Sequence, residues 1–263
     1  MVDKLYITYL NLSNSPKNEG TKNYFSNRLD SIMSHCKMMK SQGLVDILLL
    51  SEMTECYYDQ GETRLSIEKI ICTLALILEM KPIYLSDGNY ASAALINPSK
   101  LRHISTDGPL LNVKVKLVND DKDTDNIFNF ILIDVPKSND WNPDLIHSII
   151  RHNNGPLIFI GSFYYIHGNT GENIDDGMSE RLTDLTSEIG VTFKAFQHDD
   201  DSNDDSKDNS NDDSNKKSLK VLINEEFKLL TRDIEIKKLI PQNINGLKLS
   251  EHHILVIEIK FLD

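Results

Sequence analysis

The chain has 263 residues, of which 40% are hydrophobic and 26% are charged, which is the composition of an ordinary globular protein. This composition excludes a chain that is disordered throughout and a fibrous architecture. Lys and Arg number 28 against 40 Asp and Glu, so the formal net charge is −12, and a surface of that sign does not by itself indicate a nucleic-acid partner.

The first residues contain an apolar stretch that is too short and too interrupted for a signal peptide. No run in the sequence approaches the roughly 18 apolar residues of a membrane helix. We therefore expect an intracellular protein, cytoplasmic or nuclear, with no membrane partner. The three cysteines, Cys36, Cys56 and Cys72, lack metal-binding spacing, and we expect reduced thiols in or near the core.

Short apolar runs rich in β-branched and aromatic residues recur along the chain and predict about nine strands. These runs are 5–10, 45–50, 83–86, 92–96, 111–117, 128–135, 157–160, 219–223 and 254–261. Apolar side chains at helical spacing predict helices over 22–42, 64–79 and 179–189. A shorter helix is expected to follow Pro143 and to extend through Ile149.

The many strands and few helices disfavour a doubly wound parallel sheet, which needs a helix after each strand. A predicted hairpin between 111–117 and 128–135 also disfavours a fully parallel sheet, because the strands of a hairpin are antiparallel. The runs 45–50 (VDILLL, with Asp46 its one polar residue) and 157–160 (LIFI) are continuously apolar in the rest of their length, as in strands covered on both faces. The sequence thus predicts an α/β or α+β fold in which two mixed β-sheets pack face to face in a sandwich, with helices on the outer faces.

We interpret residues 1–263 as one domain with a polar insertion. Residues 199–217 are only Asp, Ser, Asn and Lys, with eight Asp and three Lys. Such a segment has no apolar side chain that could offset the entropy of ordering it, so we expect a disordered acidic loop between two strands.

Polar residues stand at the ends of four predicted strands, where accessible chemistry is expected. They are Asn11 (ITYLNLS), Ser51-Glu52 (DILLLSEM), Ser162 and Tyr164 (LIFIGSFY), and Glu251-His252 (SEHHILVIEI). Their order and flanking apolar runs resemble the four signature positions of the endonuclease/exonuclease/phosphatase superfamily. That superfamily includes apurinic-site endonucleases, pancreatic-type deoxyribonucleases and inositol-phosphate phosphatases. The resemblance extends from Leu5 to Phe261.

The resemblance implies a residual metal site. The family's main metal ligand corresponds to Glu52, and its partner after the first strand corresponds to Asn11. Both residues offer oxygen atoms suited to one Mg²⁺, which keeps several of its waters. The family's His corresponds to His252, which would stabilise the pentavalent phosphorane or protonate the leaving group.

The chain departs from the family at the other signature positions. An Asp-x-Asn pair that activates the attacking water is replaced by Ser162 and Tyr164, neither of which can act as a carboxylate base. Glu251 replaces an Asp and is longer by one methylene. Asp134 stands where the family has His or Tyr, so an anion replaces a donor to the phosphate.

These departures favour a catalytically degenerate member of the fold, a binding or structural protein with an unidentified protein partner and a weak or lost Mg²⁺ site. The alternative is a divergent Mg²⁺-dependent phosphodiesterase, endonuclease or phosphatase, with a phosphate-ester or nucleic-acid substrate. In that enzyme Glu251, His252 and Asp134 would replace the missing Asp. A third hypothesis retains the sandwich only as a scaffold whose loops make the interactions.

Overall fold

The computed structural model describes residues 2–12, 22–53, 56–58, 63–86, 91–108, 110–118, 126–134, 148–149, 151–153, 155–164, 182–186, 217–239 and 254–262. The elements are β1 (Lys4–Asn11), α1 (Lys22–Ser41), β2 (Ile47–Met53), β3 (Cys56–Tyr58), β4 (Thr63–Leu65), α2 (Ile67–Leu78), β5 (Lys81–Ser86), β6 (Ala91–Ile96), β7 (Leu101–Asp107), β8 (Leu111–Leu117), β9 (Ile127–Asp134), β10 (Leu157–Tyr164), β11 (Leu182–Asp184), β12 (Lys217–Asn224), α5 (Glu225–Leu230), β13 (Thr231–Leu239) and β14 (Ile254–Phe261). None of the helices in these ranges is long and apolar enough to cross a membrane.

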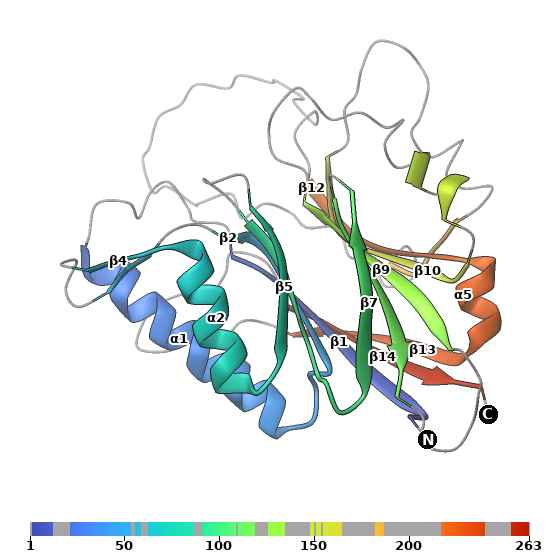
Figure 1. Cartoon of the computed structure of the whole chain (residues 1–263), viewed down its shortest axis with the longest axis horizontal. Coiled ribbons are helices and arrows are strands. Elements are labelled where there is room, and N and C mark those ends of the chain that lie inside the picture. Colours follow the sequence, from blue (N-terminus) through green and yellow to red (C-terminus); the bar gives the residue numbers. More distant parts are fainter. Residues whose placement is uncertain are drawn as a thin grey trace, which may run out of the picture.

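Most strands belong to two six-stranded sheets. The first has the order β13-β14-β1-β2-β6-β5 and the second has the order β11-β12-β10-β9-β8-β7. Each sheet contains one parallel pair, β1 with β2 and β9 with β10, among antiparallel pairs. In Figure 1, α1 and α2 lie on the left beside β2 and β5 of the first sheet, and β9 and β10 of the second sheet lie on the right, above β13 and β14 of the first. The predicted two-sheet sandwich with outer helices is confirmed.

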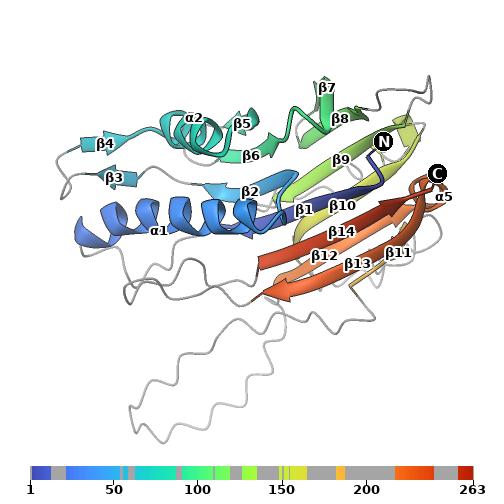
Figure 2. The ribbon, with the colours of Figure 1, turned by 90° about the horizontal axis from the view of Figure 1, so that it is seen from below.

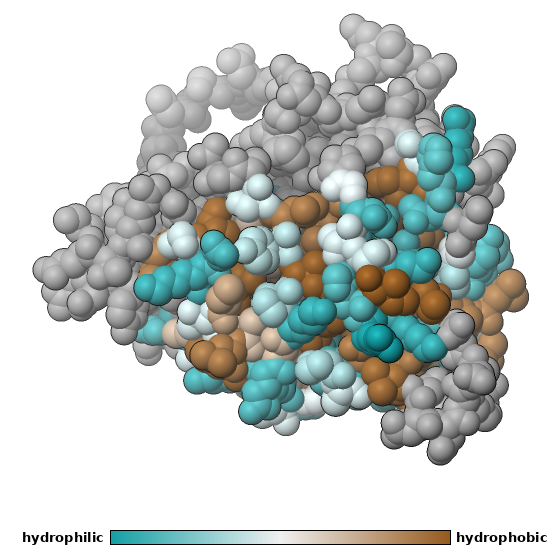
Figure 3. All heavy atoms as spheres, viewed as in Figure 1, coloured by the Kyte–Doolittle hydropathy of each residue, from teal (hydrophilic) through white to brown (hydrophobic). Residues whose placement is uncertain are grey.

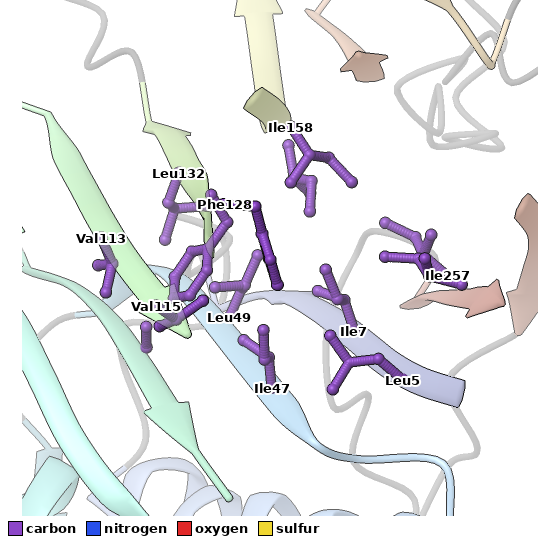
Figure 4. Packing of buried hydrophobic residues seen from close by; sticks show 14 of the residues in the cluster. Leu5, Ile7, Ile47, Leu49, Val113, Val115, Phe128, Leu132, Ile158 and Ile257 are labelled. Atoms are coloured by element: carbon purple, nitrogen blue, oxygen red, sulfur yellow. The ribbon is translucent and has the colours of Figure 1, made fainter. Parts of the chain in front are cut away.

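The main core lies between the sheets and is built from alternate residues of each strand. Leu5 and Ile7 of β1 and Leu49 of β2 lie toward Phe128 of β9 across the interface (Figure 4). Each is at most 1% exposed. Full burial of one such side chain stabilises the fold by about 1.5–3 kcal/mol, so this alternation determines which face of each strand is internal.

A second core lies under α1 and α2, which cover the outer face of the first sheet (Figure 2). The Ser66 hydroxyl caps α2 by accepting a hydrogen bond from the Lys69 amide at 3.3 Å. The buried row of α1 is Ile32, His35, Cys36 and Met39, at helical spacing.

One end of the sandwich is braced by a buried carboxylate. Asp46 is 4% exposed and precedes β2. It accepts hydrogen bonds from the Tyr6 amide at 3.0 Å, from Lys100 Nζ at 2.9 Å and from Asn97 Nδ2 at 3.3 Å. These contacts tie the start of β1 to the connection between β6 and β7.

The edge strands β5 and β7 approach each other on one side of the sandwich, where Lys81 Nζ lies 3.5 Å from His103 Nδ1. Burial and the charge of Lys81 lower the pKa of His103. Hydrophilic and hydrophobic side chains are interspersed over these two strands (Figure 3). An irregularity between His103 and Ser105 interrupts β7, as is common on edge strands that avoid pairing with other chains.

Several local predictions are confirmed. The antiparallel pairing of β8 with β9 confirms the hairpin. The burial of all four residues over 157–160 confirms a strand covered on both faces. Residues 148–149 and 151–152 are helical, while most of the predicted helix that follows Pro143 lies outside the described residues. Of the cysteines, Cys36 and Cys72 are both free; Cys36 is buried as predicted, whereas Cys72 is exposed, so its predicted place in or near the core is wrong.

Other local predictions are wrong or incomplete. The helix predicted over 179–189 is wrong, because Leu182–Asp184 form β11, which pairs antiparallel with β12. The apolar spacing there is helical, but three residues of edge strand take the place of the helix. The strands β7 and β13 were not predicted, because polar or charged residues occupy most of their positions. Lys217 is the first residue of β12, and the rest of the predicted acidic loop lies outside the described residues.

Candidate functional site

Asn11 and Glu52 lie side by side at the ends of two neighbouring strands. Because β1 and β2 are parallel, with Asn11 opposite Ser51, the ends of both strands meet at one edge of the sheet. Asn11 is 1% exposed, and its Nδ2 donates a hydrogen bond to Glu52 Oε1 at 2.9 Å. The structure thus brings together the two residues that the sequence assigns to a metal site.

The position of Glu52 depends on a β-bulge. Leu48 and Leu50 belong to the core under the helices, so strict alternation would direct Glu52 to that face as well. Instead the register shifts: Leu50 is opposite Ala93, whereas Met53 is opposite Ala91. Two residues of β2 therefore lie between these pairs, whereas β6 has one residue there, so β2 contains one extra residue.

The backbone of Glu52 has φ 52°, a left-handed conformation that non-glycine residues seldom adopt. Asn11 continues the row of Leu5, Ile7 and Tyr9, which faces the second sheet. The bulge and the left-handed residue therefore bring the Glu52 carboxylate to the row of Asn11. Strained residues of this kind cluster at functional sites.

Two further residues support this corner: Ser51, which the sequence places beside Glu52 without assigning it a role, and Tyr9, which was not identified from the sequence. The hydroxyl groups of Tyr9 and Ser51 are 2.8 Å apart, and the Leu12 amide donates to the Ser51 carbonyl at 2.9 Å. The signal was available in the sequence: Ser51 immediately precedes Glu52, and Tyr9 lies two positions before Asn11, hence on the same face of β1.

In the second sheet, the register of β9 with β10 places the backbone of Asp134 opposite that of Ser162. Phe130 and Leu132 of β9 and Ile160 of β10 face the first sheet. By alternation, positions 134, 162 and 164 continue the same inner face beyond the hydrophobic core.

The strands that carry these positions begin at the same end of the sandwich. The ring centroid of Phe128, at the start of β9, lies 6.1 Å from that of Phe261. The Phe261 amide donates to the Asp3 carbonyl at 3.0 Å, beside the start of β1. The residues Asn11 and Asp134 end their strands, so both lie away from this aromatic contact, toward the other end of the sandwich.

Glu251 and His252 lie outside the described residues. The strand that follows them, β14, starts beside the end of β1, because Leu255 is opposite Tyr9. Of the remaining site residues, the structure gives the backbone positions of Asp134, Ser162 and Tyr164 and the contact of Asn11 with Glu52.

The oxygen atoms of Asn11 and Glu52 are the donors that Mg²⁺ prefers, and Mg²⁺ commonly binds through one or two protein groups and several waters. The donor set therefore fits this ion. In the ranges that the structure covers, no three His, Cys, Asp or Glu side chains gather as a metal centre. Two oxygen donors would leave most of the coordination sphere of such an ion to water.

Comparison with known proteins places the fold. No protein-family model matches the chain, and no curated protein matches its sequence. Among solved structures, D. rerio TDP2 complexed with a single-strand DNA product matches with a TM-score of 0.61 and 11% identity, over 98% of this chain and 99% of that chain. A mannosyl-6-phosphatase from Bacteroides thetaiotaomicron matches with a TM-score of 0.56 and 13% identity, over 98% and 100% of the two chains.

An endonuclease/exonuclease/phosphatase family protein from Leptotrichia buccalis matches with a TM-score of 0.53 and 14% identity, over 98% of this chain and 100% of that chain. Identities this low establish the fold alone. The chain therefore has the fold of the endonuclease/exonuclease/phosphatase superfamily, as the residues at its strand ends imply.

Proposed function

We propose that this protein is a non-hydrolytic binding protein that holds a phosphate-bearing ligand at the end of the sandwich formed by Asn11 and Glu52. The observation that carries the proposal is that Ser162 and Tyr164, at the end of β10, occupy the positions where the family has its Asp and Asn. Hydrolysis of a phosphate ester needs a group that accepts a proton from the attacking water. Ser162 and Tyr164 are an alcohol and a phenol, which do not accept that proton near neutral pH.

Glu52 and Asn11 would hold one Mg²⁺, and that ion would supply positive charge for the oxygens of a phosphate group. The contact between Asn11 Nδ2 and Glu52 Oε1 supports this role, because it orients the carboxylate that would meet the ion.

The ligand class follows from the fold and the charge. Two of the three named neighbours carry phosphate chemistry in their descriptions, a single-strand DNA product and a mannosyl-6-phosphatase. The net charge of −12 opposes the approach of a polyanion. We therefore propose that binding of a phosphate-bearing ligand depends on the divalent ion.

The second candidate is a divergent Mg²⁺-dependent phosphodiesterase or phosphatase. It is favoured by the register of Asp134 opposite Ser162. Neighbouring strands are about 4.8 Å apart, so a carboxylate-bearing residue occupies the strand next to the position where the family has its Asp. In this enzyme Asp134, with Glu251 and His252, would take over proton transfer.

The test measures metal binding and turnover together. Mn²⁺ and Mg²⁺ are titrated into the wild type and Glu52→Gln by calorimetry, with Glu68→Gln as control. Glu68 is exposed on α2 and accepts a hydrogen bond from Tyr84, away from the site. Bis-p-nitrophenyl phosphate and an abasic DNA duplex serve as substrates, and a single-stranded oligonucleotide and mannose 6-phosphate serve as ligands.

We expect weak metal binding that is lost in Glu52→Gln and kept in Glu68→Gln. The phosphate-bearing ligands should bind only when the metal is present. Neither substrate should be cleaved faster by the wild type than by Glu52→Gln. Turnover that Glu52→Gln abolishes would instead establish the second candidate. A wild type that binds neither metal nor ligand would contradict both candidate functions and favour the hypothesis that the sandwich serves only as a scaffold.

A further inference from the structure

A buried pair of hydroxyl groups lies directly beside the Asn11 and Glu52 corner. Tyr9 is 1% exposed and Ser51 is fully buried, and their side-chain oxygens are 2.8 Å apart. Both belong to strand faces that are otherwise apolar, since Ile7 and Leu49 flank them in the same core. A buried hydroxyl is unfavourable unless it is hydrogen-bonded, so an apolar pair would fill this space more simply.

The pair anchors the bulge that aims Glu52. Ser51 begins the irregular part of β2, between Leu50 and Met53. Two hydrogen bonds tie Ser51 to β1: its side chain contacts Tyr9, and its carbonyl accepts from the Leu12 amide at 2.9 Å. The next residue is Glu52, in its left-handed conformation. The backbone of Ser51 is thus held against the neighbouring strand immediately before the left-handed residue Glu52.

We propose that Tyr9 and Ser51 are positioning residues whose hydrogen bond fixes the bulge and so keeps the Glu52 carboxylate against Asn11. This inference rests on the proposed function, in which Glu52 holds the divalent ion. Residues that orient metal ligands affect the affinity for the metal without touching it.

A purely structural role makes a different prediction from a positioning role. Tyr9→Phe and Ser51→Ala each leave one buried hydroxyl without this partner, so each lowers stability. The double variant removes both hydroxyls, and replacing both partners with apolar groups can be nearly neutral for stability. If the pair serves stability alone, every property should recover in the double variant. If it positions Glu52, stability recovers while the bulge and the metal affinity do not.

The first readout does not require metal. Hydrogen exchange of the Leu12 amide reports the bulge, because that amide donates to the Ser51 carbonyl. We expect its exchange to accelerate by about tenfold in both single variants and in the double variant, the effect of weakening one hydrogen bond of ordinary strength. The Asn97 amide donates to the Asp46 carbonyl at 2.8 Å at the far end and should exchange at the wild-type rate.

The second readout is Mn²⁺ affinity, which should fall about 10–100-fold in the three variants, the usual range for residues behind a metal ligand. Tyr84→Phe is the matched control. Its phenol hydrogen-bonds to Glu68 Oε1 at 2.9 Å, outside the site, and its loss should leave the affinity unchanged.

The outcomes separate the two proposals. A double variant whose melting temperature returns toward the wild type while Leu12 exchange stays fast supports positioning. Recovery of Leu12 protection together with the melting temperature would overturn it. If the wild type binds no metal, the proposed function fails, and Leu12 exchange still decides whether Tyr9 and Ser51 fix the bulge.

Discussion

Gly161 lies against the backbone of Ile133 so closely that no other residue fits there. A Cβ on Gly161 would overlap the Ile133 carbonyl oxygen and lie 2.7 Å from its carbonyl carbon. The φ of Gly161 is 150°, which side chains rarely allow. This approach joins β9 to β10 directly before the position where Ser162 is opposite Asp134.

We expect Gly161→Ala to lower the free energy of unfolding by about 2–4 kcal/mol, because the clash with backbone adds to the conformational strain. Urea denaturation measures the change. Gly155→Ala is the matched control, since Gly155 has φ 140° and nothing within 4 Å of an added Cβ. The control should show the strain alone, and equal losses in both variants would contradict the role assigned to the contact with Ile133.

Restoring the family pair should create activity. In Ser162→Asp/Tyr164→Asn, a carboxylate returns to the inner face of β10, and general-base catalysis typically contributes 10²–10⁴-fold, so we expect Mg²⁺-dependent cleavage of bis-p-nitrophenyl phosphate to rise by about 100-fold or more over the wild type. Adding Glu52→Gln should remove the gain. A wild type that already cleaves as fast as the double variant would show that Ser162 and Tyr164 are not what limits the chemistry.

Loss of charge at Asp46 should destabilise the whole fold. Its carboxylate is buried and accepts from Lys100 Nζ, the Tyr6 amide and Asn97 Nδ2. Asp46→Asn weakens all three contacts, and we expect a loss of about 2–3 kcal/mol in the free energy of unfolding. The control is Asp233→Asn, which breaks an exposed pair with Lys260 at 2.8 Å and should have little effect.

The stability of the protein should fall in mild acid because of His35. This side chain is 3% exposed, and neither ring nitrogen has a hydrogen-bond partner among the residues that the structure describes. Burial lowers the pKa of His35 from the ordinary value of 6.5. Below pH 6.5 the unfolded chain binds a proton at this residue while the folded chain does not. The contribution of His35 to stability is therefore complete above that pH and is lost as the pH falls toward the lowered value.

We expect the free energy of unfolding to drop by up to about 1.4 kcal/mol per pH unit below pH 6.5 because of this residue. His35→Leu should remove that part of the dependence, since Leu suits the buried row of α1. Urea denaturation at several pH values between 5 and 7.5 provides the measurement. His152→Gln, on an exposed helical turn, should keep the slope, and a slope unchanged in His35→Leu would refute the assignment.

The fold could be predicted from the sequence where one face of a strand is continuously apolar. Ile47 to Leu50 and Leu157 to Ile160 are buried on both faces, and their composition shows it. The pattern failed for three of the four edge strands of the two large sheets, β7, β11 and β13. Thr231–Leu239 has apolar residues only at Ile234, Ile236 and Leu239 among charged neighbours, because its outer face meets solvent.

The candidate site was only partly predictable. The residue types at Asn11 and Glu52 and their places after strands are visible in the sequence. Their contact depends on one extra residue in β2 relative to β6, and no residue type in this part of the sequence predicts such a bulge. Strict alternation would have sent Glu52 to the face under the helices. The supporting role that we infer for Tyr9 and Ser51 likewise became visible only when the two strands were placed side by side.

The two ends of the sandwich are built for different tasks. At one end the buried Asp46 network and the contact of Phe128 with Phe261 lock the starts of the strands together. At the other end lie Asn11 and Glu52 and the backbone positions of Ser162 and Asp134. The contacts that brace the strands and the residues of the candidate site are therefore separated along the strands. Substitutions at one end can change stability while the geometry at the other end is kept, so a melting temperature and a binding constant report on different ends of this molecule.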